Sequence, residues 1–219
     1  MIRTAYIEQQ RGLQDNVITL GSMTEKAIGR AVEALRNQDS DLALRVIEGD
    51  QAINQLRWEI ENDVLTILAT QGPMARDLRR ITAAMMIATE LERMADHAEG
   101  IAVLTRRTAE EPLLKPLVDI PRMADIAREL LLAALDAFVE TDAERARQIA
   151  RRDDEVDRLY EQVYRELLTF MISDPRTITR ATHLLWVAHN VERIADRVTN
   201  ICERIIFVAT GDIEEMNRK

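Results

Sequence analysis

Cysteine, glycine, proline and aromatic residues are all scarce in this sequence, and each scarcity narrows the choice of fold. Cys202 is the only cysteine among 219 residues, which excludes an intramolecular disulfide and favours a reducing compartment. Seven glycines and five prolines are too few for the many turns of an all-β protein. Aromatic residues make up only 4%, whereas Ala, Leu, Ile, Arg and Glu abound, and this composition favours packed helices.

Long apolar runs and an excess of positive charge are also lacking. No segment approaches the roughly 20 apolar residues that a membrane-spanning helix needs, and the first residues do not resemble a signal peptide. The net charge of −9 counts against a nucleic-acid partner, because such binding relies on Lys and Arg against phosphate. We expect a cytoplasmic protein that meets the inner face of a membrane only peripherally, through its partners.

The apolar pattern predicts an all-α protein of six long helices. Apolar residues recur at helical spacing over residues of about 6–37, 41–70, 73–107, 122–140, 141–172 and 175–210. Thr141 and Glu144 form a capping-box pattern at the start of the fifth helix. Three prolines between residues 112 and 121 exclude a continuous helix there. We expect a first three-helix bundle over residues 1–108, a linker over 109–121 and a second bundle over 122–219.

The two predicted bundles are related by an internal repeat. At an offset of 103, several residues of the second helix match residues of the fifth, among them Asp39 with Asp142 and Asp50 with Asp153. Beyond the following turn the offset is 100, and the stretch from Glu92 to Asp96 matches 192–196. The offset changes where a turn can absorb a difference in length, which indicates a duplicated three-helix unit.

Acidic residues interrupt the apolar faces of four of these helices, at equivalent places in both halves. An unpaired carboxylate in a core is costly, and acids four residues apart on a helix repel one another, so something must compensate them. In an antiparallel hairpin, residues at one level have a constant sum of residue numbers. The sum is 146 for Asp50 with Asp96 and for Asn54 with Glu92, and it is 349 for Asp153 with Asp196 and for Asp157 with Glu192. We predict two metal sites, formed by Asp50, Asn54, Glu92 and Asp96 and by Asp153, Asp157, Glu192 and Asp196.

Two readings of these acids remain open. Neighbouring arginines could neutralise them in a salt-bridge network, the candidates being Arg57, Arg93, Arg158 and Arg193. Four such pairs of side chains with oxygen ligands, three of them wholly acidic, meet two by two and favour cations instead. Oxygen ligands without paired Cys or His suit Mg, Ca, Mn or iron better than a closed structural zinc site. Glu99 and Asn200 lie one turn further along and are candidate outer ligands, whereas His97 has no histidine counterpart at position 197.

The paired stretches Glu92-Arg93-Met94-Ala95-Asp96 and Glu192-Arg193-Ile194-Ala195-Asp196 resemble the E-R-x-x-D motifs of the PhoU family. The D-x-x-x-N at 50–54 and the D-x-x-x-D at 153–157 resemble its partner motifs, and the resemblance covers nearly the whole chain. It implies two three-helix bundles, multinuclear clusters of iron or zinc on these acidic motifs, and a homodimer. It also implies a negative regulator of phosphate uptake that links a phosphate ABC transporter ATPase to a membrane sensor kinase.

Other function classes are weighed against this one. A redox di-metal enzyme on a helical bundle typically uses Glu-x-x-His ligand pairs, and no Glu in this chain is followed by His at that spacing. We therefore expect a protein that is not an enzyme. An accessory protein of another phosphate transporter and a helical scaffold whose acids only pair with arginine remain the alternatives.

Overall fold

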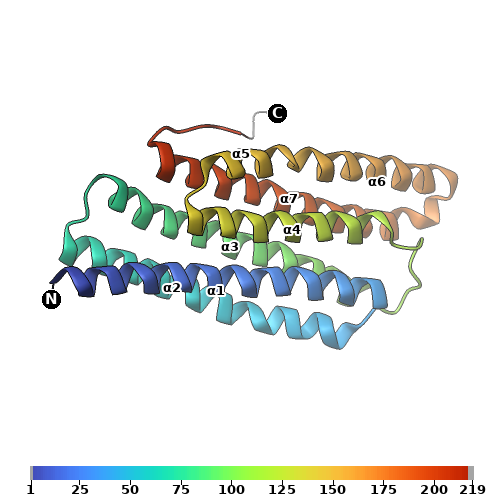
Figure 1. Cartoon of the computed structure of the whole chain (residues 1–219). Coiled ribbons are helices and arrows are strands. Elements are labelled where there is room, and N and C mark those ends of the chain that lie inside the picture. The colour runs from blue at the N-terminus through green and yellow to red at the C-terminus, as the bar shows by residue number, and fades with distance from the viewer. Residues whose placement is uncertain (1, 217–219) are drawn as a thin grey trace.

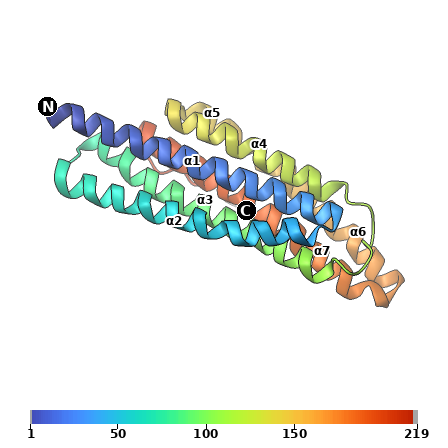
Figure 2. The same cartoon turned by 90° about the horizontal axis from the view of Figure 1, so that it is seen from below.

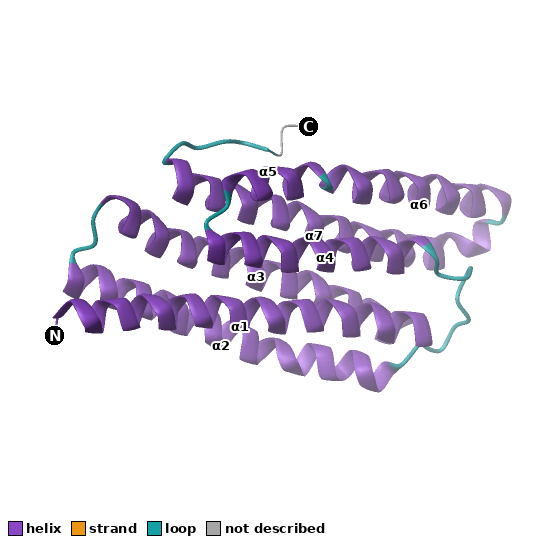
Figure 3. Ribbon diagram, in the orientation of Figure 1, coloured by secondary structure: helices purple, strands orange, loops and turns teal. Residues whose placement is uncertain are grey.

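The computed structural model describes residues 2–216, and within this range the chain consists of helices joined by loops, without a strand (Figure 3). The helices are α1 (Ile2–Asn37), α2 (Ser40–Gln71), α3 (Ala75–Thr108), α4 (Asp119–Glu140), α5 (Ala143–Arg151), α6 (Asp153–Ser173), the 3-10 turn η1 (Pro175–Thr177) and α7 (Ile178–Thr210). The predicted all-α class and the repeated three-helix unit are confirmed. None of these helices is long and apolar enough to cross a membrane.

Each half of the molecule is an antiparallel bundle (Figures 1 and 2). In the first half α1, α2 and α3 all contact one another, and in the second half α4 and α7 pack with α5 and α6. Two helix pairs join the halves over the described residues: α1 lies along α4, and α3 lies along α7. The α3–α7 pair therefore runs through the middle of the molecule.

The fifth predicted helix is divided at Arg152 into α5 and α6. The Arg152 amide donates to the Ile149 carbonyl at 3.0 Å, which is a tighter turn than an α-helix makes. The predicted cap at Thr141 is wrong. Thr141 has a left-handed φ of 56° and ends α4, whereas the side chain of Asp142 accepts from the Arg145 amide at 2.9 Å and caps α5.

The same turn joins the first two helices of each half. Gln38 and Thr141 both have a positive φ, of 51° and 56°, and the next residues, Asp39 and Asp142, are N-caps with nearly equal backbone angles. The offset of 103 therefore holds from α1 and α4 through α2 and α5–α6. Buried positions follow it, including Val17 with Ile120, Ile28 with Leu131, Leu35 with Phe138, Val46 with Ile149, Ile53 with Val156 and Ile60 with Val163.

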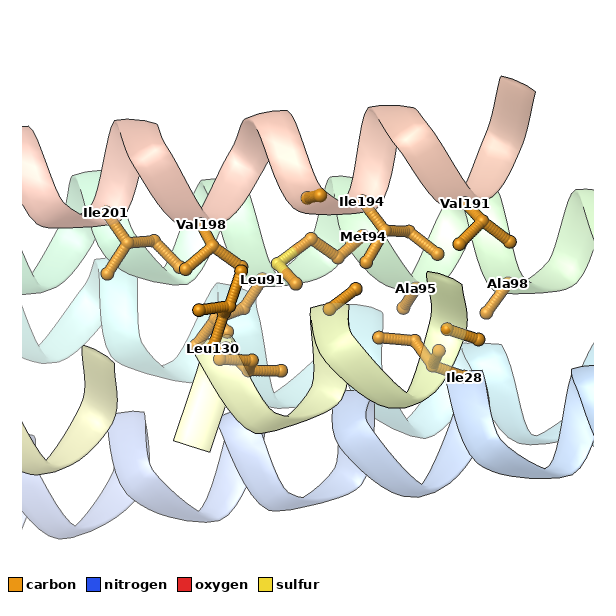
Figure 4. Close-up of a cluster of buried hydrophobic side chains, with 14 of the residues drawn as sticks. Ile28, Leu91, Met94, Ala95, Ala98, Leu130, Val191, Ile194, Val198 and Ile201 are labelled. Carbon is orange, nitrogen blue, oxygen red and sulfur yellow. The ribbon is translucent and has the colours of Figure 1, made fainter. Parts of the chain in front are cut away.

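The buried side chains of both halves form one continuous core. Figure 4 shows its centre, where side chains from α1, α3, α4 and α7 meet; those labelled are Ile28, Leu91, Met94, Ala95, Ala98, Leu130, Val191, Ile194, Val198 and Ile201. Burial of such apolar surface is the main favourable term in folding. The segment 109–118 connects α3 to α4 outside the helices, while Pro121 lies in the first turn of α4. The division into separate domains at 108 and 122 stays a proposal, because the core crosses it.

Polar contacts between α3 and α7 are reciprocal, as a duplicated unit requires. Glu90 of α3 accepts from Arg197 at 3.2 Å and from Asn200 at 3.0 Å. At the equivalent place on the other side, His97 of α3 contacts the Asn190 side chain of α7, with 2.9 Å between Nδ1 and Oδ1. The equivalent pairs differ in charge, since Asn190 stands opposite a histidine whereas Glu90 faces a guanidinium.

Candidate metal centre

The hairpin of α2 and α3 brings three carboxylates together. Gly72 ends α2 with a left-handed φ of 54°, and α3 then returns along it. Asp50, Asp96 and Glu99 each offer an oxygen, and these oxygens lie within 4.8 Å of one another. Asp50 and Glu99 are half-buried and Asp96 is exposed. Asp50 faces Asp96, as the constant sum of residue numbers predicted. We name Asp50, Asp96 and Glu99 the acidic cluster.

No basic side chain compensates this cluster. Among the described residues, no Lys, Arg or His nitrogen lies within 4.0 Å of a carboxylate oxygen of Asp50, Asp96 or Glu99. One oxygen of Asp50, Oδ2, accepts from the Asn54 amide at 2.6 Å. The other, Oδ1, is buried and accepts no hydrogen bond. A buried acceptor without a partner is costly, and a cation is the natural partner for oxygens that converge in this way.

The pKa values of three acids in this hairpin are raised by burial and by repulsion from neighbouring acids. Burial raises the pKa of Asp50, and repulsion from Asp96 raises it further. Burial also raises the pKa of Glu99, with smaller contributions from Asp50 and Asp96. The pKa of Glu92 is raised by burial and then by Asp96, although Arg57 acts in the opposite direction. The protein environment thus disfavours the charged forms that a bound cation would favour.

Glu92 lies at the rim of the cluster. Its Oε1 is 3.7 Å from Nε of Arg57, and the same arginine also pairs with Glu61. The Arg57 guanidinium lies 5.9 Å from the ring centre of Trp58. Asp50, Asn54, Arg57, Trp58 and Glu92 line an open groove of about 790 Å³ over the hairpin. Of the four ligands predicted for the first half, the structure brings Asp50 and Asp96 closest, with Asn54 bonded to Asp50 and Glu92 drawn towards Arg57.

The equivalent acids of the second half have different neighbours. Arg193 contacts Asp196, with 2.8 Å between Nη1 and Oδ2, and His189 lies 3.4 Å from Glu192. Asp153 is buried at the start of α6, and Asp157 is half-buried one turn later. Between residues 109 and 216, no three acidic or imidazole groups converge as the acidic cluster does. The second predicted site stays a prediction, and two of its acids, Glu192 and Asp196, have a basic side chain beside them.

Arg93 and Arg193 hold equivalent positions in the two motifs but have different partners. In the first half Arg93 turns back to Glu90, 3.7 Å away, and leaves Asp96 uncompensated. In the second half the position equivalent to Glu90 is Asn190, which carries no charge. Arg193 turns instead to Asp196. The arginine of each E-R-x-x-D motif thus contacts a carboxylate three residues away on its own helix.

The helix break at Arg152 adds a second difference. Asp153 is the first residue of α6, where the free amides and the positive end of the helix dipole favour a carboxylate. Its equivalent, Asp50, lies inside the uninterrupted helix α2 and has no such amides. The two equivalent acids therefore differ in their place along the helix, a difference that the sequence repeat does not show.

Sequence reasoning placed Glu99 and Asn200 one turn outside the predicted sites. Glu99 instead belongs to the acidic cluster, since it is three residues after Asp96 and shares its face of α3. Its equivalent in the second half is the buried Thr199, so the repeat gave no signal for it. Asn200 bonds to Glu90, and burial lowers the pKa of His97, whose ring faces Asn190.

The residues present fit a hard cation. Asp50, Asp96 and Glu99 would hold it through carboxylate oxygens, with Asn54 and Glu92 close enough in the hairpin to contribute further oxygens. An ion would satisfy the buried Oδ1 of Asp50 and relieve the repulsion that raises the pKa of these acids. No thiolate can take part, because Cys202 is buried on α7 and burial raises its pKa to about 12.

The fold and the acidic hairpins define a duplicated helical-bundle protein with a PhoU domain in each half. The model of the PhoU domain matches residues 17–105 and, again, residues 120–205. The chain therefore belongs to the PhoU family, as the resemblance of its motifs implied.

Relatives support this assignment over nearly the whole chain. The chain is 36% identical to the "Phosphate-specific transport system accessory protein PhoU homolog" of Clostridium acetobutylicum, covering 99% of this chain and 100% of the relative. It is 38% identical to the accessory protein PhoU of Escherichia coli K12, over 91% of this chain and 83% of that protein. The crystal structure of PhoU from Pseudomonas aeruginosa superimposes with a TM-score of 0.90 at 33% identity, covering 94% of this chain and 100% of that one.

Proposed function

We propose that this protein is a negative regulator of phosphate uptake and of the phosphate-starvation response. In this proposal it is a cytoplasmic adaptor between a phosphate ABC transporter ATPase and a membrane sensor kinase. The relatives' names support the first partner, because they describe accessory proteins of a phosphate-specific transport system. The regulatory role is supported by the Streptococcus pneumoniae structure, described as a phosphate transport system regulatory protein, at 30% identity and a TM-score of 0.89. The kinase rests on the family resemblance alone.

The acidic cluster is the observation that carries the metal-dependent part of this proposal. Three converging carboxylates without a basic partner, one with a buried oxygen that accepts no hydrogen bond, support a bound cation at Asp50, Asp96 and Glu99. Family resemblance favours iron or zinc, and the oxygen ligands also suit Mg, Mn or Ca. A bound ion would link α2 to α3 and thereby fix the surface that the groove beside Trp58 presents to a partner.

The scaffold alternative has observations in its favour in both halves: Arg57 lies 3.7 Å from Glu92 in the first half, and two basic side chains lie beside acids of the second half. Arg193 pairs with Asp196 and His189 lies beside Glu192, so salt bridges alone compensate part of that acidic set. We propose no catalytic role, because the arrangement offers no nucleophile next to a base around the acidic cluster. A homodimer is also proposed, on family resemblance.

Recovery of partners from membranes tests the adaptor role. Tagged protein is isolated with membranes from cells grown in high and in low phosphate, and the phosphate transporter ATPase and sensor kinase are measured by quantitative mass spectrometry. We expect both to be enriched over an unrelated tagged helical protein, more strongly in high phosphate. Recovery of a different phosphate transporter would support the accessory alternative, and equal recovery of all membrane proteins would contradict the adaptor role.

A further inference from the structure

A second groove lies between α1 and α2 and shares no lining residue with the groove over the acidic cluster. It has a volume of about 240 Å³. Its apolar floor is formed by Met23, Ala27, Val46 and Ile53. Three cationic side chains, Lys26, Arg30 and Arg45, stand around this floor, and Gly49 forms part of the wall.

These three cations are uncompensated. No carboxylate oxygen of a described residue lies within 4.0 Å of Lys26, Arg30 or Arg45, and no acidic residue lines the groove. All three side chains are exposed. The nearby Glu25 does not neutralise them, because it forms its ion pair with Arg128 of α4 at 2.6 Å. A positive groove therefore interrupts the surface of a protein whose net charge is −9.

The repeat supplies an internal comparison for this groove. At the offset of 103, Gly49 corresponds to Arg152 and Lys26 to Glu129. Arg152 of the second half spans the equivalent space, with 3.0 Å between its Nη1 and Glu129 and 2.9 Å between its Nε and Glu155. In the second half an internal ion pair therefore connects α4 with the break between α5 and α6 at this place.

In the first half both members of that ion pair are replaced. A Cβ atom added at Gly49 would meet no atom within 4 Å, so this position is open in the first half. The residue equivalent to Glu129 is Lys26, which carries the opposite charge. The first half thus lacks the bridging arginine and has a cation in place of its partner, so the groove is complementary to an acidic group from outside the chain.

We propose that the groove between α1 and α2 is a docking site for an acidic, amphipathic segment of a partner protein. Carboxylates of the segment contact Lys26, Arg30 and Arg45, and an apolar side chain of the segment covers Met23 and Ala27. The apolar floor favours a protein segment over a small anion, because inorganic phosphate has no apolar surface to bury against it. Among the described residues, no side-chain hydrogen bond holds Lys26, Arg30 or Arg45 in place. Such flexible charges suit the steering of an approaching partner better than the tight binding of a small ion. This inference goes beyond the proposed function and does not depend on a bound metal.

A variant that copies the second half into the first tests this docking site. Lys26→Glu with Gly49→Arg recreates the ion pair and fills the groove. The full chain is titrated with a fluorescent helical peptide that presents Glu beside Leu, and with versions in which Glu is replaced by Gln or by Lys. We expect the wild type to bind the Glu peptide in a salt-sensitive manner and the variant to bind it roughly tenfold more weakly.

Two further variants control for folding and net charge. Arg11→Gln, also on α1 and outside the groove, lowers the net charge by one unit, as the double variant does. We expect it to bind the Glu peptide like the wild type. Arg30→Gln with Arg45→Gln leaves the groove open and removes two cations, and we expect it to bind more weakly as well. Circular dichroism melts verify that each variant is folded.

Four outcomes would overturn the proposal. One is that the wild type does not bind the Glu peptide, or binds the Gln peptide equally well. Another is that the filled groove binds it as tightly as the wild type does. A third is that the groove variants lose binding of inorganic phosphate or of anionic lipid vesicles while peptide binding is unchanged. The fourth is a change of oligomeric state by analytical ultracentrifugation with unchanged peptide binding, which would make a second copy of the chain the occupant.

Discussion

The two halves of this protein carry the same acidic motifs, yet equivalent acids of the two halves have different neighbours among the described residues. Asp50 and Asp96 converge with Glu99 and have no cationic neighbour, whereas Asp196 is held by Arg193. The arginines of the two motifs also differ in their partners, since Arg93 lies 3.7 Å from Glu90 whereas Arg193 contacts Asp196, and the position equivalent to Glu90 is the uncharged Asn190. We propose that the first copy of the duplicated motif is the better suited to binding a metal ion.

The largest expected effect is the loss of metal from one half at a time. Glu92→Ala with Asp96→Ala removes acids from the first hairpin, and we expect metal binding there to be abolished, because affinity depends on ligand number and charge. Binding in the second half should persist, since each predicted site lies within its own hairpin. Isothermal titration of the metal-free protein measures both sites.

The matched variant is Glu192→Ala with Asp196→Ala, which should leave the first site intact. Loss of all metal in either double variant would contradict independent sites. In the metal-free state, Glu92→Ala with Asp96→Ala should not lower the melting temperature, because it removes repulsion around Asp50.

A smaller effect is expected at the contact between the halves. Glu90→Gln weakens the bonds to Arg197 and Asn200 and leaves a largely buried guanidinium without its carboxylate. We expect a loss of about 1–3 kcal/mol in the free energy of unfolding, measured in urea. His97→Gln on the equivalent, uncharged side should cost less. Equal losses on the two sides would mean that the charge of Glu90 adds nothing.

Arg193→Ala tests the compensation of the second half directly. It removes the ion pair with Asp196, and we expect the affinity of that half for metal to rise by a few-fold, as a partly exposed salt bridge is worth at most about 1 kcal/mol. Asn190→Glu should act in the same direction by drawing Arg193 away, as Glu90 draws Arg93. Unchanged affinity in both variants would show that Arg193 does not compete with a cation.

The smallest effect is a pH dependence that belongs to the first half. The pKa values of Asp50, Glu92 and Glu99 are raised in the folded protein, so the folded state binds protons more readily than the unfolded state. The stability of the metal-free protein should therefore increase as pH falls from neutral towards these raised values, and decrease as pH rises through them. Urea titrations in chelator over a pH series measure this slope. In the Glu92→Ala, Asp96→Ala variant the slope should be smaller.

The sequence alone was sufficient for the architecture and for the central pair of the site. Apolar periodicity gave the helices and the repeat gave the two units, because the buried positions of α1–α2 and α4–α6 obey one register. The sum of residue numbers predicted that Asp50 faces Asp96, since an antiparallel hairpin with a short turn leaves little freedom in its register.

Three features could not be predicted from the sequence, because they depend on contacts between residues that the apolar pattern and the repeat do not show. The helix breaks at Arg152, whose side chain pairs with Glu129 and Glu155. Helix propensity alone favours a continuous helix there, so the break could not be predicted. Glu99 has no counterpart in the second half, so the repeat could not identify it. Arg93 has a carboxylate three residues away on either side and contacts Glu90, whereas Arg193 has one only at Asp196 and contacts it, and the motif does not show which partner is taken.

Metal content and chelator sensitivity of the wild-type protein test the central claim most directly. Elemental analysis of protein purified without chelator is combined with thermal melts before and after chelation. A cation on the acidic cluster predicts bound metal in at least the first half and a melting temperature that falls on chelation, because an ion that binds only the folded state stabilises it. The Glu92→Ala, Asp96→Ala variant should carry less metal and show a smaller shift. Equally little metal in wild type and variant, with a wild-type melt that chelator leaves unmoved, would contradict the claim.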